Sequence, residues 1–286
     1  MAAAPTSDPE PPATSDESSS DDDSLVLEGE LTRHPDAPES SSSDEEDDEN
    51  PKKQPPTSDD DEKPRKKTKK NEPDILQVEF SFFDMQEQFF HGIKALLPHN
   101  SSSLVDTMIQ NVAVGTVVSA DDAVFGFASV LNVSTYQETE GIQLLKKLCL
   151  DGCPNDRQEK LQVVLSGQTK QPAGFLLHGR MINLPLEIVL VLHQQLEKDL
   201  DWAAQQKDSH DFGVLIRLAP CTKEKGSLVV HRFFDDEVLA GRADFTYTVD
   251  GPQRYSSEEK EFLQVIVLTK QGHREALRDL EKMIGR

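Results

Sequence analysis

Residues 172–200, with the sequence PAGFLLHGRMINLPLEIVLVLHQQLEKDL, constrain the fold more than any other part of the chain. The apolar run GFLL is typical of a buried strand, and a polar loop carrying His178, Arg180 and Asn183 is expected to follow it. Pro185 then suits the first turn of a helix, where its missing N–H costs nothing. Apolar side chains recur at every fourth position, which predicts a helix with one buried face made of Leu184, Ile188, Leu192, Leu196 and Leu200. The stretch therefore predicts a strand, loop and helix unit, with Arg180 and Asn183 at the junction.

The sequence on both sides of this unit alternates between strand-like and helix-like patterns. Apolar residues that alternate with polar ones predict a half-buried strand, whereas a spacing of three and four predicts an amphipathic helix. Because these patterns do not segregate along the chain, the predicted fold class is α/β (α+β), a single domain around one mixed sheet. Strands are expected near 76–82, 115–118, 124–133, 212–219, 228–234, 243–249 and 263–268, and helices near 89–97, 104–112, 138–150, 155–165 and 276–284.

The first 72 residues differ sharply in composition from the remainder. They hold 22 of the 52 acidic residues and nine of the 30 Lys and Arg residues, with almost no Ile, Leu, Val or Phe. Such a segment cannot bury enough apolar surface to offset its conformational entropy, so residues 1–72 are expected to form a disordered acidic tail. The change in composition at Pro73 predicts that residues 73–286 fold as one domain with a substantial core.

Acid runs in this tail follow serines and threonines. Serines of these runs have an acidic residue three positions later, which is the pattern that an acidophilic kinase prefers, and phosphate there would deepen the negative field. The alternative is a tail that only keeps the protein in solution. The candidate phosphoacceptors are Ser20, Ser41, Ser42, Ser43 and Ser58.

A cluster of bases ends the tail. Residues 63–70, KPRKKTKK, follow a Lys52-Lys53 pair at a bipartite spacing, which is typical of a segment that binds a nuclear-import receptor. The alternatives are a nucleic-acid-binding arm and a simple counterweight to the acids, and the flanking acid runs argue against nucleic acid because they would repel phosphates. The sequence therefore predicts a nuclear protein whose import signal comprises Lys63, Arg65, Lys66, Lys67, Lys69 and Lys70.

No part of the sequence has the spacing of a catalytic, metal or cofactor site. Eight histidines are scattered, with no two at a metal-binding spacing, and there is no nucleophile elbow, phosphate-binding loop or dinucleotide fingerprint. Cys149 and Cys153 could face a metal together on a helix, but no further pair completes the set, so they are interpreted as core thiols. The odd cysteine count, the lack of a signal peptide and the lack of a bilayer-spanning apolar run predict a soluble protein in a reducing compartment.

Three blocks of the sequence resemble the BCCIP family, the BRCA- and CDK-inhibitor-interacting protein with its fungal and plant relatives. They are DAVFGFASVLN from Asp122, GFLLHGRMINLP from Gly174, and FFDDEV from Phe233 with the later FTYTV. Their order and spacing are similar to those of the family, and the resemblance spans roughly Ile75 to Arg286. The residues that match its motifs are Phe125, Gly126, Phe127, Gly174, Arg180, Asn183 and Pro185.

This resemblance implies a fold similar to that of the GCN5-related N-acetyltransferases, and a nuclear role. The family is implicated in large ribosomal subunit assembly, in chaperoning and export of client proteins, and in DNA repair and cell-cycle control. We therefore expect a non-enzymatic interaction protein that shuttles between nucleus and cytoplasm. Its expected partners are basic clients such as a large-subunit ribosomal protein, import and export receptors, and repair or cell-cycle proteins, without direct binding of nucleic acid or membrane. The net charge of -22 independently suits a chaperone of basic clients.

Two alternatives remain: an acyltransferase-like enzyme on that fold, and a checkpoint or repair adaptor without chaperone activity. The acetyltransferases hold the cofactor pyrophosphate with backbone N–H groups of a Gln/Arg-x-x-Gly-x-Gly/Ala loop at a helix N-terminus. The nearest match starts at Gln171, but Pro172 lacks an N–H, Leu176 replaces the last small residue, and a strand follows. The sequence thus argues against the enzyme and predicts no cofactor. His178 and Arg180 are the most site-like residues, although such residues more often hold a loop by hydrogen bonds and ion pairs.

An acidic face is the predicted contact for a basic client. Asp235, Asp236 and Glu237 directly follow a Phe-Phe pair, and apolar and charged groups together are what specific interfaces need. Asp121 and Asp122 form a second candidate patch. A solvated turn between two strands is the alternative interpretation of residues 235–237.

Overall fold

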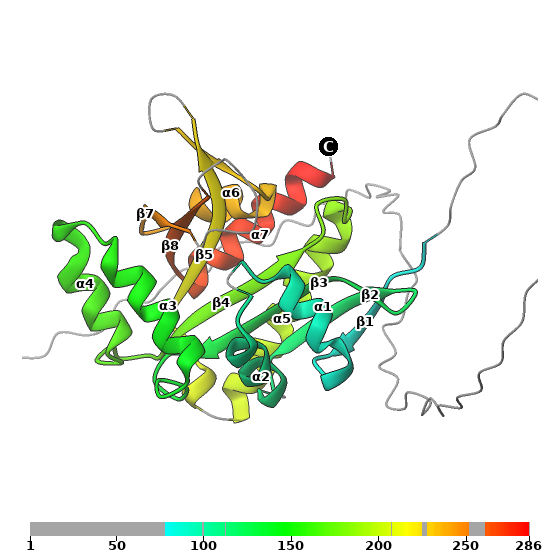
Figure 1. Ribbon diagram of the computed structural model, residues 1–286, viewed down its shortest axis with the longest axis horizontal. Coiled ribbons are helices and arrows are strands. Elements are labelled where there is room, and N and C mark those ends of the chain that lie inside the picture. The colour runs from blue at the N-terminus through cyan, green and yellow to red at the C-terminus, as the bar shows by residue number, and fades with distance from the viewer. Residues whose placement is uncertain are drawn as a thin grey trace, which may run out of the picture. The chain divides into compact units, whose positions relative to one another are not determined.

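The computed structural model describes residues 78–98, 100–111, 113–206, 208–224, 228–251 and 261–285. They belong to one compact unit, centred on a mixed sheet of eight strands in this part of the chain (Figure 1). The strand order is β1-β2-β3-β4-β5-β8-β7, and β6 pairs with the last residues of β5. The strands are β1 (Ser81–Asp84), β2 (Gly115–Ala120), β3 (Ala123–Asn132), β4 (Ala173–Arg180), β5 (Val214–Lys223), β6 (Val229–His231), β7 (Phe245–Asp250) and β8 (Phe262–Thr269).

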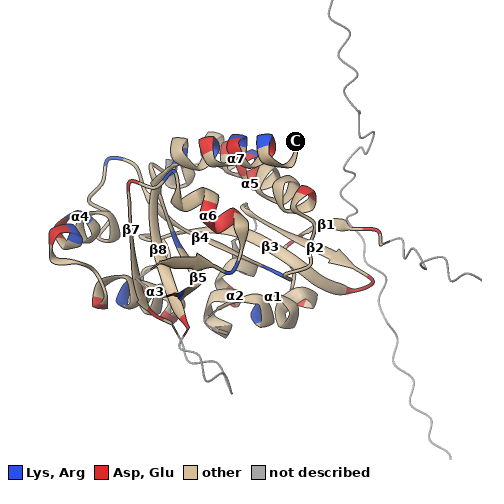
Figure 2. Ribbon diagram, turned by 90° about the horizontal axis from the view of Figure 1, so that it is seen from above, with Lys and Arg blue, Asp and Glu red and all other residues tan. Residues whose placement is uncertain are grey.

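Helices cover both faces of the sheet, so the molecule has three layers (Figure 2). One face carries α1 (Phe90–Leu96), α2 (Ser102–Gln110), α3 (Glu140–Asp151) and α4 (Asn155–Leu165). The other face carries α5 (Leu186–Gln206), α6 (Phe234–Ala240) and α7 (Lys270–Ile284). Two single-turn 3-10 helices, η1 (Glu87–Phe89) and η2 (Asp208–His210), precede α1 and follow α5.

Each face of the sheet buries its own apolar core, because side chains alternate along the strands. On β4, Phe175 and Leu177 belong to the core under α1–α4, whereas Leu176 belongs to the core under α5–α7. Continuing the alternation places His178 and Arg180 on the same face as Leu176, beneath the second helical layer. Strand β4 therefore places two polar side chains, His178 and Arg180, next to the apolar core under α5–α7.

The central strands β4 and β5 are the one parallel pair among the pairings described, and α5 is the crossover between them. All the other described strand pairs are antiparallel. The β4–β5 ladder ends at Phe175 and Ile216, although both strands continue beyond these residues. The strands thus separate towards their carboxyl ends, which is where ligands of open α/β sheets bind.

The predicted fold class, a single mixed-sheet α/β domain, is confirmed, and the apolar stripe of α5 is buried as expected. Two local predictions are wrong. His178 and Arg180 lie on β4 and not in a loop, because the strand continues to Arg180; and the strand expected at 228–234 is only the short β6, followed by α6. The resemblance to the acetyltransferase fold stays a prediction, and the tail with its import signal and phosphoacceptors lies outside the described residues. No helix in the described part is long and apolar enough to cross a membrane.

Candidate functional site

A cluster of six buried polar residues fills the space between the separating strands. Every member is at least nine-tenths buried, although all six carry or can carry a full charge. The cluster joins four elements, since β4, α5, β5 and α6 each contribute to it. We call it the buried polar cluster, and its members are His178, Arg180, His193, Arg217, Asp235 and Asp236.

Asp236 is the centre of the first half of the buried polar cluster. Its Oδ1 accepts a hydrogen bond from Arg217 Nε at 3.0 Å, its Oδ2 accepts one from Arg217 Nη2 at 3.3 Å, and His178 Nε2 lies 3.0 Å from Oδ1. This two-point contact with a guanidinium is the strong form of a carboxylate ion pair. A carboxylate can only accept, so His178 must carry its proton on Nε2.

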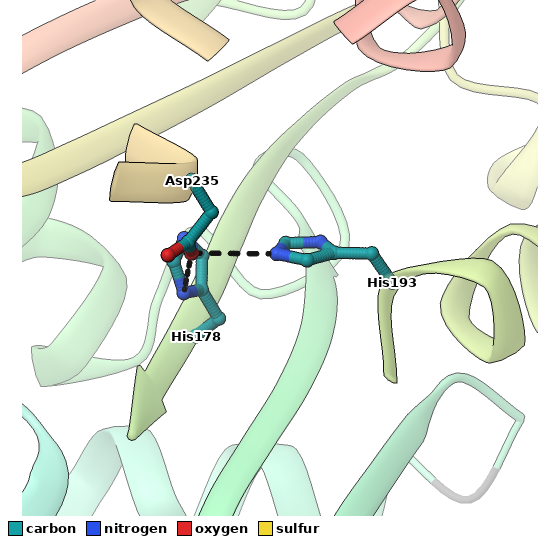
Figure 3. A group of neighbouring side chains, drawn as sticks. All are labelled: His178, His193 and Asp235. Carbon is teal, nitrogen blue, oxygen red and sulfur yellow. Dashed lines mark ion pairs between the residues drawn. The ribbon is translucent and has the colours of Figure 1, made fainter. Parts of the chain in front are cut away.

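Asp235 is the centre of the second half. Its Oδ1 accepts hydrogen bonds from Arg180 Nε at 3.1 Å and Nη2 at 2.7 Å, and the Arg180 guanidinium stacks 4.5 Å above the Phe233 ring. Its other oxygen, Oδ2, has no hydrogen-bond partner. That oxygen lies 3.6 Å from both His178 Nδ1 and His193 Nε2, so three side chains from three elements converge on one point (Figure 3).

The ionisation states follow from burial and from these partners. Burial alone would raise the pKa of Asp236, but Arg217 and His178 outweigh it and hold that pKa below its usual range. The pKa of Asp235 is also lowered, because its contacts with His193 and Arg180 outweigh its burial. Burial and the Arg217 charge lower the pKa of His178 to about 4. At neutral pH the cluster therefore holds two carboxylates, two guanidinium groups and a neutral His178.

A third buried histidine, His273 on α7, lies next to His193 of the buried polar cluster. The rings of His178 and His193 lie 5.0 Å apart, and those of His193 and His273 lie 5.8 Å apart. His273 Nδ1 contacts Glu197 on α5, and Arg274 Nε donates to the other Glu197 oxygen at 2.7 Å. Among the buried side-chain N and O atoms of the described residues, His193 Nδ1 and His273 Nε2 also lack a hydrogen-bond partner.

The position of Asp235 and Asp236 corrects the prediction that they form an acidic surface. They are 2% and 0% exposed, respectively, because they occupy the inward side of the first turn of α6 and not a solvated turn. Their charges are neutralised internally, which removes them from any surface field. Only Glu237 of the predicted trio is exposed.

The second predicted patch lies elsewhere on the sheet. Asp121 and Asp122 are exposed in the tight turn between β2 and β3, with φ values of 47° and 62°. Two consecutive positive φ values are what a two-residue hairpin turn requires, and Asp tolerates them better than most residues. The structure therefore gives these two residues a conformational role and separates them from α6, which packs on α7, β6 and β8.

The outward side of α6 forms a shallow groove with α7. It encloses about 370 Å³ and is lined by Phe234, Glu237, Val238, Gly241, Arg242, Asp279 and Met283. Phe234 and Met283 expose 40% and 49% of their surface, respectively. Arg242, the base in the groove, is paired with Asp279 and lies 3.5 Å from Glu275. The α6–α7 groove therefore combines exposed apolar side chains with an acidic rim.

The residues that carry the family motifs are mostly packing residues. A Cβ on Gly174 would lie 2.5 Å from Val130 and 3.0 Å from the Phe212 ring, so glycine is required there by close packing. Phe127 is fully buried, Phe125 is partly buried beside Phe80, and a Cβ on Gly126 would lie 3.1 Å from Leu184. Arg180 is the motif residue that belongs to the buried polar cluster. Asn183 and Pro185 are exposed between β4 and α5.

Comparison with known proteins shows which family the sequence matches. Residues 75–272 match the family model described as BCCIP. A Protein BCCIP homolog of Danio rerio is 36% identical over 146 residues, which cover 43% of this chain and 48% of that protein. The human BRCA2 and CDKN1A-interacting protein is 32% identical over 148 residues, which cover 44% and 47%, respectively. The match thus spans about half the length of these curated relatives.

Fungal proteins give longer matches at lower identity. Protein bcp1 of Schizosaccharomyces pombe is 23% identical over 213 residues, which cover 68% of this chain and 74% of that protein. The crystal structure of BCP1 from Saccharomyces cerevisiae superposes with a TM-score of 0.56 at 17% identity, over 74% of this chain and 92% of that chain. The superposition shows a shared fold.

Proposed function

The chain belongs to the BCCIP family, and on that basis we propose that it is a non-enzymatic nuclear protein that binds basic client proteins through the α6–α7 groove. In this proposal it acts as a chaperone and export adaptor, most directly for a large-subunit ribosomal protein. Residues 63–70 supply nuclear import, and the acidic tail assists in holding the client.

One observation carries the proposal: the α6–α7 groove places Phe234 and Met283 beside Glu237 and Asp279. Exposed ion pairs contribute only about 0–1 kcal/mol each, so acidic residues alone would give neither affinity nor specificity. Partly exposed aromatic and Met side chains supply the apolar contact that dominates specific interfaces. Arg242 and Lys282 both pair with Asp279, but the carboxylates of Glu237 and Glu275 add further negative charge beside the groove, which favours a positively charged partner.

The structure of the α/β crevice supports a non-enzymatic role. Ligands of open α/β sheets bind at the carboxyl ends of the parallel strands, and here α6 and the buried polar cluster fill that space. Both carboxylates are bonded to arginines, and the cluster residues are almost fully buried. Such groups are bonded to one another and are not presented to a substrate.

A repair or cell-cycle adaptor is the second candidate. The human relative is named for interactions with BRCA2 and CDKN1A, and a groove of this chemistry could equally accept a basic segment of a protein of that kind. Affinity purification from nuclear extract separates the two, since ribosomal proteins or repair proteins would be the dominant partners.

The groove is tested by measuring binding of the full chain to a panel of purified basic large-subunit ribosomal proteins. The variant Phe234→Ser/Glu237→Gln should weaken binding of the cognate client at least tenfold, or about 1.4 kcal/mol, because it removes an apolar anchor and a charge. Asp121→Asn/Asp122→Asn is the control, since it removes two surface charges while keeping residues that tolerate positive φ.

Equal loss in both variants would mean that the contact depends on charge alone, and loss only in the control would move the docking face to the β2–β3 turn. Binding should also partly survive 1 M salt, where the Debye length is about 3 Å. If no member of the panel binds the wild-type chain, the chaperone proposal is wrong.

A further inference from the structure

Asp235, His178 and His193 have an arrangement that hydrogen bonding does not explain. Asp235 Oδ2 is buried and lacks a hydrogen-bond partner, yet it lies 3.6 Å from an imidazole nitrogen of each histidine. This distance is longer than a normal hydrogen bond, for which about 2.7–3.2 Å is usual. The three candidate ligand atoms lie within 4.8 Å of one another.

The protonation states make a direct contact unfavourable. The Asp236 carboxylate fixes the proton of His178 on Nε2, so Nδ1 of the neutral ring turns a lone pair towards the Asp235 carboxylate. Two buried acceptors that face each other without a donor between them destabilise the fold, and a cation between them would remove the repulsion.

We propose that His178 Nδ1, His193 Nε2 and Asp235 Oδ2 bind one divalent transition-metal ion, with zinc as the best-suited metal. Ligands at about 2.0–2.1 Å from a tetrahedral zinc ion lie about 3.3–3.5 Å apart, close to the separations seen at Asp235 Oδ2. Two imidazoles and one carboxylate form a set that zinc accepts, whereas magnesium and calcium prefer oxygen ligands.

The surrounding contacts have the form of an outer coordination shell. His178 donates its other ring N–H to Asp236, the carboxylate–histidine–metal arrangement that orients an imidazole ligand. Asp236 is in turn fixed by Arg217, and the second oxygen of Asp235 is fixed by Arg180. Two of the three ligands are therefore oriented in advance.

Charge limits the affinity of this site. The two arginines and two aspartates sum to zero, so a dication leaves the cluster with positive charge, and the site should bind zinc less tightly than the thiolate-rich structural sites do. Three protein ligands leave one tetrahedral position for a water molecule or an exogenous ligand. The bound ion would tie β4, α5 and α6 together, which assigns it a structural role beneath the α6–α7 groove. This inference does not depend on the identity of any client.

The test uses the tag-free full chain after treatment with a chelator. Wild type should take up a single equivalent of Zn²⁺ by elemental analysis and show a zinc-dependent rise in Tm. The variant His193→Leu should lose both. It is chosen because His193 makes no hydrogen bond within the normal range and its Nδ1 is an unpartnered buried atom. If these residues bind no metal, leucine should leave Tm unchanged or raise it, because it removes a buried polar atom that has no partner. The same variant therefore separates a metal site from a group of buried polar side chains that binds none. His91→Leu, at an exposed position on α1, is the control and should retain the zinc response.

Cobalt substitution gives a readout that does not depend on a variant folding. Co²⁺ bound by two imidazoles and a carboxylate should give tetrahedral visible bands without a thiolate charge-transfer band. A thiolate band would place the ion at one of the cysteines, Cys149, Cys153 or Cys221, and overturn the proposal. The proposal is equally overturned if wild type binds no zinc, or if His193→Leu responds to zinc as wild type does.

Discussion

Removing one charge from the Asp236–Arg217 pair should destabilise the protein far more than removing both. Asp236→Leu leaves the Arg217 guanidinium, whose side chain is 3% exposed, without a counter-charge. An uncompensated buried charge of this kind costs about 3–5 kcal/mol. The same change takes the acceptor from His178 Nε2, which adds about 1–3 kcal/mol for a buried unpaired donor. Together these losses are a large fraction of the stability of an ordinary domain.

The partner substitution Arg217→Met should cost less, because a histidine can replace the lost charge. Arg217 is one cause of the depressed pKa of His178, so without it that pKa rises and His178 protonates more readily beside Asp236. In the double variant no charge remains unpaired at this position. Replacing a buried pair by apolar side chains is often neutral or stabilising by about 1–4 kcal/mol. The double variant should therefore be at least about 2 kcal/mol more stable than Asp236→Leu alone.

Equilibrium unfolding in guanidinium chloride, followed by circular dichroism, measures all four members of this cycle. Asp156→Ala is the control, since its ion pair with Arg157 is exposed and should change the free energy of unfolding by less than about 0.5 kcal/mol. Additive single losses would show that the pair is not coupled. A loss below about 1 kcal/mol for Asp236→Leu would show that Arg217 and His178 are accessible to water in solution.

Two further predictions concern acid and packing. Because the pKa of His178 falls from 6.5 in the unfolded chain to about 4 in the fold, the unfolded chain binds the extra proton between these values. The free energy of unfolding should thus have its full value above pH 6.5 and fall towards pH 4 by up to about 1.4 kcal/mol per pH unit. Unfolding midpoints that do not change with pH across this window would contradict the low pKa of His178. Gly174→Ala should destabilise the chain by about 1–3 kcal/mol, since its Cβ would overlap Val130. Gly241→Ala, where the nearest atom would lie at 3.4 Å, should be close to neutral, and equal thermal shifts for the two glycine variants would refute the packing argument.

The sequence predicted those features that depend on local periodicity. The stripe on α5 follows from the helical repeat, and the mixed order of elements follows from the alternation of patterns. The end of β4 was missed because His178 and Arg180 are residues typical of a loop. They lie two and four residues after Leu176, and this spacing indicates that they continue the buried face of the strand.

The buried polar cluster could not be predicted in the same way, because its members are far apart in sequence. His193 lies on the apolar side of α5, four residues after Val189, which marks a polar side chain entering a core. Its partner Asp235 and the neighbouring Asp236 come from another helix, and their sequence alone suggests surface charges. Only tertiary packing shows that Arg180 and Arg217 compensate them.

The shortness of α6 connects the interior of the protein to its proposed docking surface. A helix of seven residues has little stability of its own, so its position depends on what it packs against. Asp235, Asp236 and Leu239 face inward, while Phe234 and Glu237 face the groove. Substitutions in the buried polar cluster that leave the sheet folded should therefore displace the groove residues without touching them. A client that binds through Phe234 would lose affinity in such variants even though no charge on the surface has changed.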